Sequence, residues 1–436
     1  MRRFPTLAVA AAAAAAIALT VSSLAGTAVA GTPTGTGTGA GGRTADNPIS
    51  AYLASLPAGY QDNQVVLLDF NTRLKSLPGV DRAGYVGSVD DVAGRSTTVY
   101  WHGAPALLDR LRPLASQLGI GLKVAAWPYD AAQIAAMSRK LLHAARTGAI
   151  AGFTGSAVVG FDPATPGLEL EGSYTARPGA AAPAPAAVAS QAASIAGAPV
   201  TVLPGTAGGA ADGSRDSDYA PFYAGGLMYS PSGGEICSSG FAVHYSGADH
   251  ITTARHCRPS DFEAVDNTSA KYGSTTAWAD GGQGRVMSAG GAAFAFDGAW
   301  NSTSYWKGVV GFRDLSVGDS VCTDGANSGV HCGVQVTKLT VYWDDGYGSE
   351  PTIEAYRSAG VAVIQGDSGG PVLVPLSNGT QIYAAGMIQR WAGTNLNPNC
   401  GGTWYTGSNA CSATVGFTSM RTVVNSLSGA TLTTTS

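Results

Sequence analysis

From about residue 219 onward, short runs of β-forming residues alternate with turns rich in Gly, Ser, Asn and Asp. Regularly spaced short strands with turn signals are typical of a β-sandwich or a β-barrel. All six cysteines lie in this half, between Cys237 and Cys411. We therefore predict an all-β domain over residues 218–436. The expected strands are 241–245, 250–253, 292–296, 334–341, 361–364 and 382–388.

The chain before this half has a different, α+β pattern. Apolar residues recur at helical spacing in 105–118, and 131–146 is a second expected helix. Residues 157–162 and 168–174 read as a strand pair around a turn. A flexible Gly/Thr tract precedes this section at 31–46, and an Ala/Pro-rich linker follows from 177 to 187.

The first 30 residues predict the compartment. Arg2 and Arg3 precede an Ala-rich apolar run, and Ala28-Val29-Ala30 is a small-x-small cleavage site. This pattern is typical of a secretory signal peptide, with a buried or membrane-anchoring helix as the alternative. We expect a secreted, extracellular protein in an environment that permits disulfides. The net charge of −4 gives no basic footprint for nucleic acid, and no later segment predicts a membrane span.

The strongest chemical signal is the segment Gly366–Pro371, with the sequence GDSGGP between two apolar runs. A serine between glycines on a tight turn exposes its hydroxyl. Backbone N–H groups beside it can form an oxyanion hole, and small residues let a substrate backbone approach closely. Ser368 is therefore the candidate nucleophile.

A serine nucleophile needs a base, and His256 is the candidate. It stands in the segment Thr252–Cys257, TTARHC, at the end of an expected strand. Because no histidine follows Ser368, the Ser–acid–His order of α/β-hydrolases is excluded. Asp249 lies too close to His256 for the subtilisin order, so His–Asp–Ser remains.

Two aspartates compete as the acid that orients His256. Asp297 has the more apolar neighbours, whereas Asp280 lies in a Gly-rich turn. The residues alone leave this choice open.

TARHC followed by GDSGGP resembles the chymotrypsin-like serine peptidase family, and within it the bacterial secreted branch of α-lytic protease and the streptogrisins. The resemblance covers about residues 219–436. It implies two six-stranded Greek-key β-barrels with a short C-terminal helix. The short histidine-to-acid spacing of that branch, and the strands that must follow the acid, favour Asp280. Asp297 remains the alternative.

The resemblance also implies roles for other residues. The backbone N–H groups of Gly366 and Ser368 would form the oxyanion hole, and Ala362, Val363 and Gln389 would line the specificity pocket. Ala362 takes the place of the aspartate that trypsin-type pockets carry, so we expect cleavage after apolar residues. The implied disulfides are Cys237–Cys257, Cys322–Cys332 and Cys400–Cys411.

Three departures from the family pattern stand out. No cysteine shortly precedes GDSGGP. Thr323 replaces an arginine that often holds the aspartate before the nucleophile, which leaves Arg357 as the candidate partner of Asp367. Arg390 and Trp391 follow the pocket strand where small residues are usual, so we expect them to crowd the substrate sites.

The expected product is a monomeric serine endopeptidase without metal or cofactor, acting on peptides or proteins. By position and analogy, residues 31–217 are a pro-region that acts as folding catalyst and inhibitor. A catalytically silent secreted binding module on the same fold is the alternative, and a serine esterase is a further one.

Overall fold

The computed structural model describes residues 48–104, 107–150, 153–161, 167–174, 185–204, 215–216, 218–265, 267–301, 306–396 and 410–435. The predicted signal peptide and the Gly/Thr tract lie outside these residues. In the described part of the chain, no helix has both the length and the apolar character needed to cross a bilayer.

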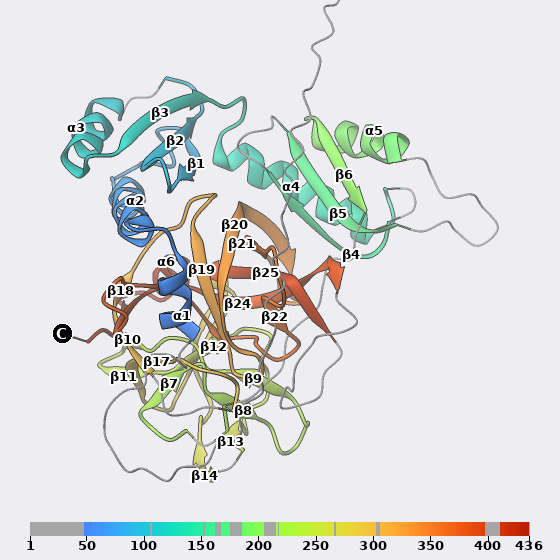
Figure 1. Cartoon of the computed structure of the whole chain (residues 1–436). Helices are drawn as coiled ribbons and strands as arrows, with labels where there is room; N and C mark the ends of the chain where they lie inside the picture. Colours follow the sequence, from blue (N-terminus) through green and yellow to red (C-terminus); the bar gives the residue numbers. More distant parts are fainter. Residues whose placement is uncertain are drawn as a thin grey trace, which may run out of the picture. The chain divides into compact units, whose positions relative to one another are not determined.

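The first described section carries three helices and a small sheet (Figure 1). Strands β1 and β2 are antiparallel, and β3 adds parallel to β2. Leu67, Phe70, Trp101 and Leu111 form its buried core with their neighbours. The elements are α1 (Pro48–Ser55), α2 (Tyr60–Lys75), β1 (Tyr85–Asp91), β2 (Ser96–Trp101), α3 (Leu108–Leu118) and β3 (Gly121–Ala126).

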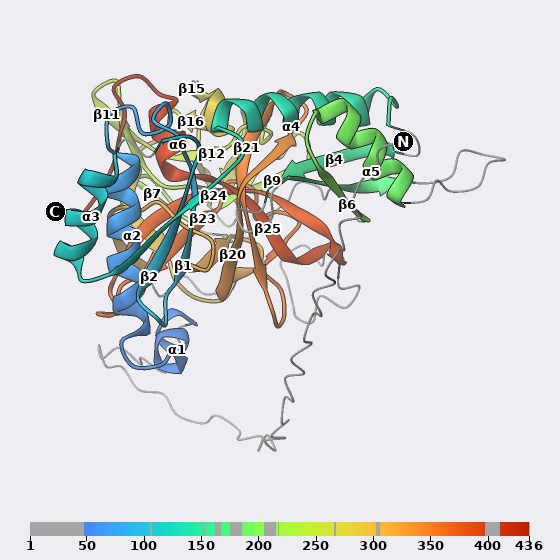
Figure 2. The same ribbon diagram turned by 90° about the horizontal axis from the view of Figure 1, so that it is seen from above.

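The next section joins two helices to three strands that extend the 13-stranded sheet, seen from above in Figure 2. The predicted helix 131–146 is confirmed as α4, whose Asp130 and Gln133 form a reciprocal capping box. The predicted strand pair is also confirmed. The last residues of the linker expected at 177–187 instead begin a helix at Pro185, and a strand that the sequence did not predict follows it. The elements are α4 (Ala131–Arg146), β4 (Phe153–Gly160), β5 (Leu168–Tyr174), α5 (Pro185–Ala196) and β6 (Val200–Pro204).

This difference has a packing reason. Alanine-rich sequence lacks turn or periodic signals, but Val188, Ala192 and Ala196 are buried in one cluster with α4 and β5. Alanine has the highest intrinsic helix propensity, so a modest buried stripe is enough to fix a helix there. Residues 175–184, most of the expected linker, lie outside the described part.

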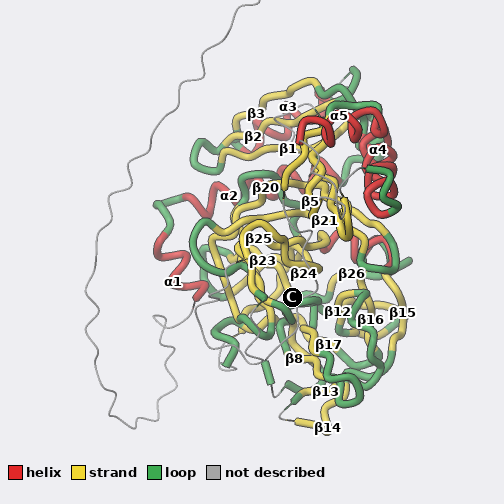
Figure 3. Tube along the Cα trace, turned by 90° about the vertical axis from the view of Figure 1, so that its right-hand side faces the viewer, coloured by secondary structure: helices red, strands yellow, loops and turns green. Residues whose placement is uncertain are grey.

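Beyond residue 218 the structure is dominated by strands, drawn yellow in Figure 3. The first strand group consists of short strands in small antiparallel sheets, plus β7 and β17, which pair parallel to each other at one end of the 13-stranded sheet. Its elements are β7 (Phe222–Ala224), β8 (Leu227–Tyr229), β9 (Ile236–Ser238), β10 (Val243–Tyr245), β11 (Ala248–His250), β12 (Thr252–Ala254), β13 (Glu263–Ala264), β14 (Asn267–Lys271), β15 (Thr275–Ala279), β16 (Gly284–Met287) and β17 (Gly291–Phe296).

The second strand group contains six strands that pair antiparallel in a closed ring, in the order β19, β20, β21, β25, β24, β23 and back to β19. Its interior is apolar and fully buried, with Val334, Val372 and Phe417 in the core. The elements are β18 (Trp306–Phe312), β19 (Ser320–Gly325), β20 (Gly329–Asp344), β21 (Ser349–Arg357), β22 (Val363–Ile364), β23 (Pro371–Pro375), β24 (Gln381–Leu396), β25 (Cys411–Ser419), α6 (Met420–Asn425) and β26 (Thr431–Leu432).

The two halves of the sequence are hydrogen-bonded to each other. Strand β4 pairs antiparallel with β20 through Val341 and Gly160. The Gln64 side chain on α2 donates to the Ser320 carbonyl at 2.7 Å and accepts from the Ser320 N–H at 2.8 Å. The long hairpin of β20 and β21 therefore contacts the α+β half and also, at its tip, the site described next.

Candidate active site

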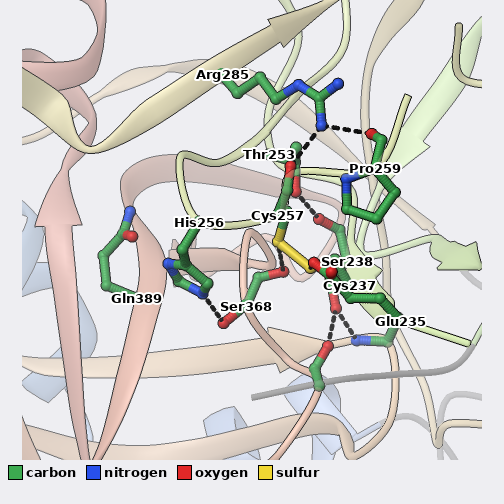
Figure 4. Close-up of a disulfide and its surroundings, with 12 residues drawn as sticks. Glu235, Cys237, Ser238, Thr253, His256, Cys257, Pro259, Arg285, Ser368 and Gln389 are labelled. Carbon is green, nitrogen blue, oxygen red and sulfur yellow. Dashed lines mark hydrogen bonds between the residues drawn. A yellow bond between two sulfur atoms is a disulfide. The ribbon is translucent and has the colours of Figure 1, made fainter. Parts of the chain in front are cut away.

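His256 and Ser368 come from different strand groups and meet at hydrogen-bond distance. His256 follows β12, and Ser368 lies on the turn between β22 and β23. The His256 Nε2 to Ser368 Oγ distance is 2.6 Å (Figure 4). Ser368 is fully buried, so the expectation that this turn exposes the serine hydroxyl is wrong. The histidine and the serine that the sequence motifs single out are therefore brought together in the geometry of a base and its nucleophile.

Strand β9 fastens the two motifs to each other (Figure 4). Cys237 forms a disulfide with Cys257, the residue after His256. The Ser238 N–H donates to the Ser368 carbonyl at 2.7 Å, and its hydroxyl donates to the Gly366 carbonyl at 2.9 Å. Thus β9 holds the histidine loop by a covalent bond and the serine loop by hydrogen bonds.

We expect Cys237→Ser/Cys257→Ser to lower the free energy of unfolding by about 3 kcal/mol, because the bond closes a loop across a sequence separation of 20. Urea denaturation of the full chain in the Ser368→Ala background measures this change. Cys322→Ser/Cys332→Ser is the matched control, since its loop spans a sequence separation of only 10 and does not include His256. A smaller loss for the first pair than for the second would contradict the expectation.

Glycines around Ser368 are required by close packing. A Cβ on Gly369, which has φ +88°, would lie 2.3 Å from both the Ser238 carbonyl oxygen and the Thr253 hydroxyl. Gly366 has φ +113°, a conformation that L side chains rarely adopt. The Gln365 carbonyl accepts from the Asn327 amide, so the Gly366 N–H of the same trans peptide points the opposite way.

Asp367 is fully buried and accepts four hydrogen bonds. The donors are the N–H groups of Asn327, Ser328 and Ile364, at 2.9 to 3.1 Å, and the Ser328 hydroxyl at 2.6 Å. Burial raises the pKa of Asp367 to about 6, and these hydrogen bonds oppose the rise. The expectation that Arg357 holds Asp367 is wrong: Arg357 donates to the Cys332 and Val361 carbonyls instead.

Neither candidate acid is hydrogen-bonded to His256. The Asp280 side chain is 72% exposed and lies 3.5 Å from Arg255 Nη1. Asp297 is fully buried and pairs with Lys307 at 3.0 Å. His256 Nδ1 is buried and has no hydrogen-bond partner among the residues that the structure describes. The structure therefore joins the base and the nucleophile but places neither carboxylate on the imidazole.

Three residues that the sequence did not connect with the histidine line its surroundings. The Trp343 ring meets the imidazole edge-on, with centroids 5.8 Å apart. Gln283 is fully buried and donates to the Trp343 carbonyl at 3.2 Å. Gln389 is fully buried, donates to the Gln283 carbonyl, and lies beside His256 in Figure 4. No sequence motif marks Gln283 or Trp343, because only the fold brings β20 and residue 283 to the histidine loop.

Burial dominates the ionisation of His256. It lowers the pKa of the imidazole to about 4; the Asp345 charge raises it, and Arg255 and Arg258 lower it further. The imidazole is therefore neutral, and able to accept the serine proton, through the whole neutral and mildly acidic range.

We expect kcat/KM of the processed protein to stay level from pH 7 down to about pH 5 and to fall with an apparent pKa of about 4. The sign follows from the lowered pKa, since protonation removes the base only below that value. Initial rates on a neutral ester substrate across pH 3–8 measure the profile, with stability checked at each pH. A fall centred at the ordinary histidine value of about 6.5 would contradict burial as the controlling factor.

The expected specificity residues lie deep in the structure. Ala362 and Val363 are fully buried in the core of the second strand group. We expected Arg390 to crowd the substrate sites. Instead it is fully buried and pairs with Glu354 on β21 at 2.8 Å. Trp391 is partly buried and packs against the same core.

Two of the three implied disulfides are described, Cys237–Cys257 and Cys322–Cys332. Cys400 lies outside the described residues, so its pairing with Cys411 stays an expectation. Glu235, Cys237 and Cys257 lie close enough together to resemble a metal-binding group. Both of these sulfurs are held in the disulfide and are not thiolate ligands.

No protein-family model matches the chain. Solved structures of bacterial chymotrypsin-like serine proteases match about half of it. Thermobifida fusca protease A is 21% identical over 49% of this chain and 98% of its own, with a TM-score of 0.35. Cellulomonas bogoriensis chymotrypsin is 23% identical over 49% of this chain and 98% of its own, with a TM-score of 0.33. A glutamic acid-specific serine protease is 20% identical over 48% of this chain and 99% of its own, with a TM-score of 0.35.

Proposed function

We propose that this protein is a secreted serine endopeptidase that hydrolyses peptide bonds through an acyl-enzyme. The observation that carries the proposal is the 2.6 Å contact between His256 Nε2 and Ser368 Oγ, made by two motifs 112 residues apart. A histidine nitrogen directed at a buried serine hydroxyl on a glycine-rich turn is the minimal arrangement for nucleophilic acyl transfer.

In the proposed reaction, His256 Nε2 takes the Ser368 proton as Oγ attacks the substrate carbonyl carbon. The N–H groups of Gly366 and Ser368 stabilise the resulting oxyanion. Collapse breaks the carbon–nitrogen bond, and the imidazolium gives its proton to the leaving amine. Water, deprotonated by His256, then attacks the ester and releases the acid and the free serine.

Asp280 remains our proposed orienting acid, with Asp297 as the alternative. Asp280 has no salt bridge shorter than 3.5 Å to hold it in place, and its backbone carbonyl accepts from Arg255, the residue before His256. Asp297 is bound to Lys307, so reaching the histidine would require breaking a buried ion pair. Turnover lost in Asp297→Asn but kept in Asp280→Asn would reverse the assignment.

We further propose that residues 1–30 are a signal peptide, 31–217 a pro-region and 218–436 a peptidase domain of two Greek-key barrels. The closed ring of the second strand group supports one barrel, and the β4–β20 pairing supports a pro-region that binds the peptidase domain. Arg215 is fully buried, pairs with Asp324 on β19 at 2.6 Å and donates to the Gly298 carbonyl. In the proposed division Arg215 lies at the end of the pro-region, so this ion pair is a further contact between the pro-region and the peptidase domain.

The proposed substrates are peptides with an apolar residue on the acyl side of the cleaved bond. Support comes from Ala362 at the place where a trypsin-type pocket would carry an aspartate, and from its position in a buried cluster of apolar side chains. A panel of peptide substrates that differ only in this residue tests the preference. Fastest cleavage after Lys or Arg would overturn it.

Labelling with a fluorophosphonate tests the proposed function itself. We expect the processed protein to be labelled at Ser368, and neither Ser368→Ala nor His256→Ala to be labelled. The absence of labelling in folded, processed protein would favour a silent binding module. Turnover of esters without turnover of peptides would instead favour a serine esterase.

A further inference from the structure

The tip of the β20–β21 hairpin, residues 343–348, reaches from the second strand group to the loop that carries His256. Arg255 donates from Nε and Nη2 to the two carboxylate oxygens of Asp345, each at 2.8 Å. It also donates to the Gly348 carbonyl at 3.2 Å. The Asp345 carboxylate is fully buried and the Arg255 side chain is 3% exposed, so this is a buried, bidentate ion pair.

The same hairpin tip contacts residues that precede and residues that follow His256 in the sequence. Arg258, two residues after His256, lies 3.4 Å from the Tyr347 ring centroid. Trp343 packs edge-on against the imidazole, and its carbonyl accepts from Gln283. The hairpin tip therefore fixes the residues before and after His256 as well as the ring itself.

Arg255 also connects the hairpin to the proposed orienting acid. Its Nη1 donates to the Asp280 carbonyl at 3.0 Å and lies 3.5 Å from the Asp280 carboxylate. Among the residues that the structure describes, the charged groups that face this region include Arg255 and Arg258 on the histidine loop, Asp280 after β15, Asp345 and Glu350 on the hairpin, and Arg139 on α4.

We propose that Asp345 is a positioning residue for His256: through Arg255 it fixes the histidine loop, and its buried negative charge favours the imidazolium formed during acyl transfer. The proposal rests on the peptidase function proposed above. A carboxylate on the hairpin of the second strand group would then supply electrostatic support that neither Asp280 nor Asp297 supplies by direct contact in this structure.

Removing one partner of the ion pair should shift the pKa of His256 in the direction opposite to removing the other. Asp345→Asn leaves the Arg255 charge unbalanced, so the pKa of His256 should fall. Arg255→Met leaves the Asp345 charge unbalanced, so the pKa of His256 should rise. A purely structural clamp would disturb the loop in the same way in both variants, so opposite shifts distinguish the electrostatic role.

The primary experiment is an NMR titration of isotope-labelled histidine in the full chain carrying Ser368→Ala, with His256 assigned by comparison with His256→Gln. We expect the two single variants to move the midpoint in opposite directions by about one pH unit each. Asp344→Asn is the matched control, because Asp344 is on the same hairpin but pairs with Arg146 on α4. Shifts of the same sign, or none, would overturn the proposal.

Kinetics of the processed protein provide the second measurement. We expect Asp345→Asn to lower kcat by about 10- to 100-fold with KM nearly unchanged, and Asp345→Glu to recover part of the loss. If Asp345→Asn does not fold, the Arg255→Met midpoint decides: a rise supports the proposal and no rise overturns it. The titration needs no activity, so an inactive wild-type protein would defeat the proposed function without hiding the result on Asp345.

Discussion

Ser368→Ala and His256→Ala should each lower kcat by about 10⁶-fold on a peptide substrate, and the double variant should lose no more than either single variant. The reason is the 2.6 Å contact between Nε2 and Oγ, because the proposed mechanism needs both side chains for the same proton transfer. Without Ser368, His256 has no hydroxyl proton to accept. Without His256, Ser368 has no base that can accept its proton.

Steady-state rates on the best substrate of the panel measure these losses, with active-site titration to exclude contaminating wild-type enzyme. His244→Ala is the control, since this imidazole is exposed and pairs with Asp249 at the surface. Additive losses in the double variant, or a single variant within tenfold of wild type, would show that the two residues do not act together.

Asp367→Ala should produce the largest loss of stability, about 4 kcal/mol or more. The substitution removes the acceptor of four buried donors, three of them backbone N–H groups of Ile364, Asn327 and Ser328. Each buried donor left without a partner costs about 1 to 3 kcal/mol, and water can reach none of them without opening the loop. Loss of this anchor should also disorder Gly366 and Ser368, and so lower turnover.

Urea denaturation in the Ser368→Ala background measures the change in the free energy of unfolding. Asp367→Asn should lose less, because its amide oxygen can still accept some of these hydrogen bonds. Asp81→Ala, at an exposed position on the α+β half, is the control. A loss below about 1 kcal/mol for Asp367→Ala would mean that the Asn327–Ser328 turn does not depend on the carboxylate.

Local sequence signals predicted the elements that carry strong periodicity or a distinct motif. The helix predicted at 131–146 is confirmed as α4, and the structure adds Asp130 as its capping residue. The helix expected at 105–118 is found from Leu108 to Leu118. The short C-terminal helix that the family resemblance implies is α6 at Met420–Asn425. The Ala-rich chain at 185–196 offered no such signal, and its helix exists because α4 and β5 bury its small side chains.

In the candidate site, too, some residues could be inferred from the sequence and others could not. His256, Ser368 and the pairing of Cys237 with Cys257 could be inferred because each belongs to a short motif or to the family resemblance. The support of Asp367 could not, because its donors at 327 and 328 are set by the turn between β19 and β20. We predicted Arg357 as the partner of Asp367 because the sequence shows that Arg357 is positively charged but does not show where it lies.

The sequence by itself determined a strand-rich second half, a histidine and a serine in segments that suit acyl transfer, and the chain order that excludes other serine hydrolases. Only the tertiary structure decided which groups surround them: Gln283, Gln389 and Trp343 beside the imidazole, and Asp345 on Arg255. The physical reason is range. Motifs encode backbone geometry over a few residues. Asp345 and Trp343 lie on a hairpin about 90 residues farther along the chain, and they meet the histidine loop only when that hairpin is in place.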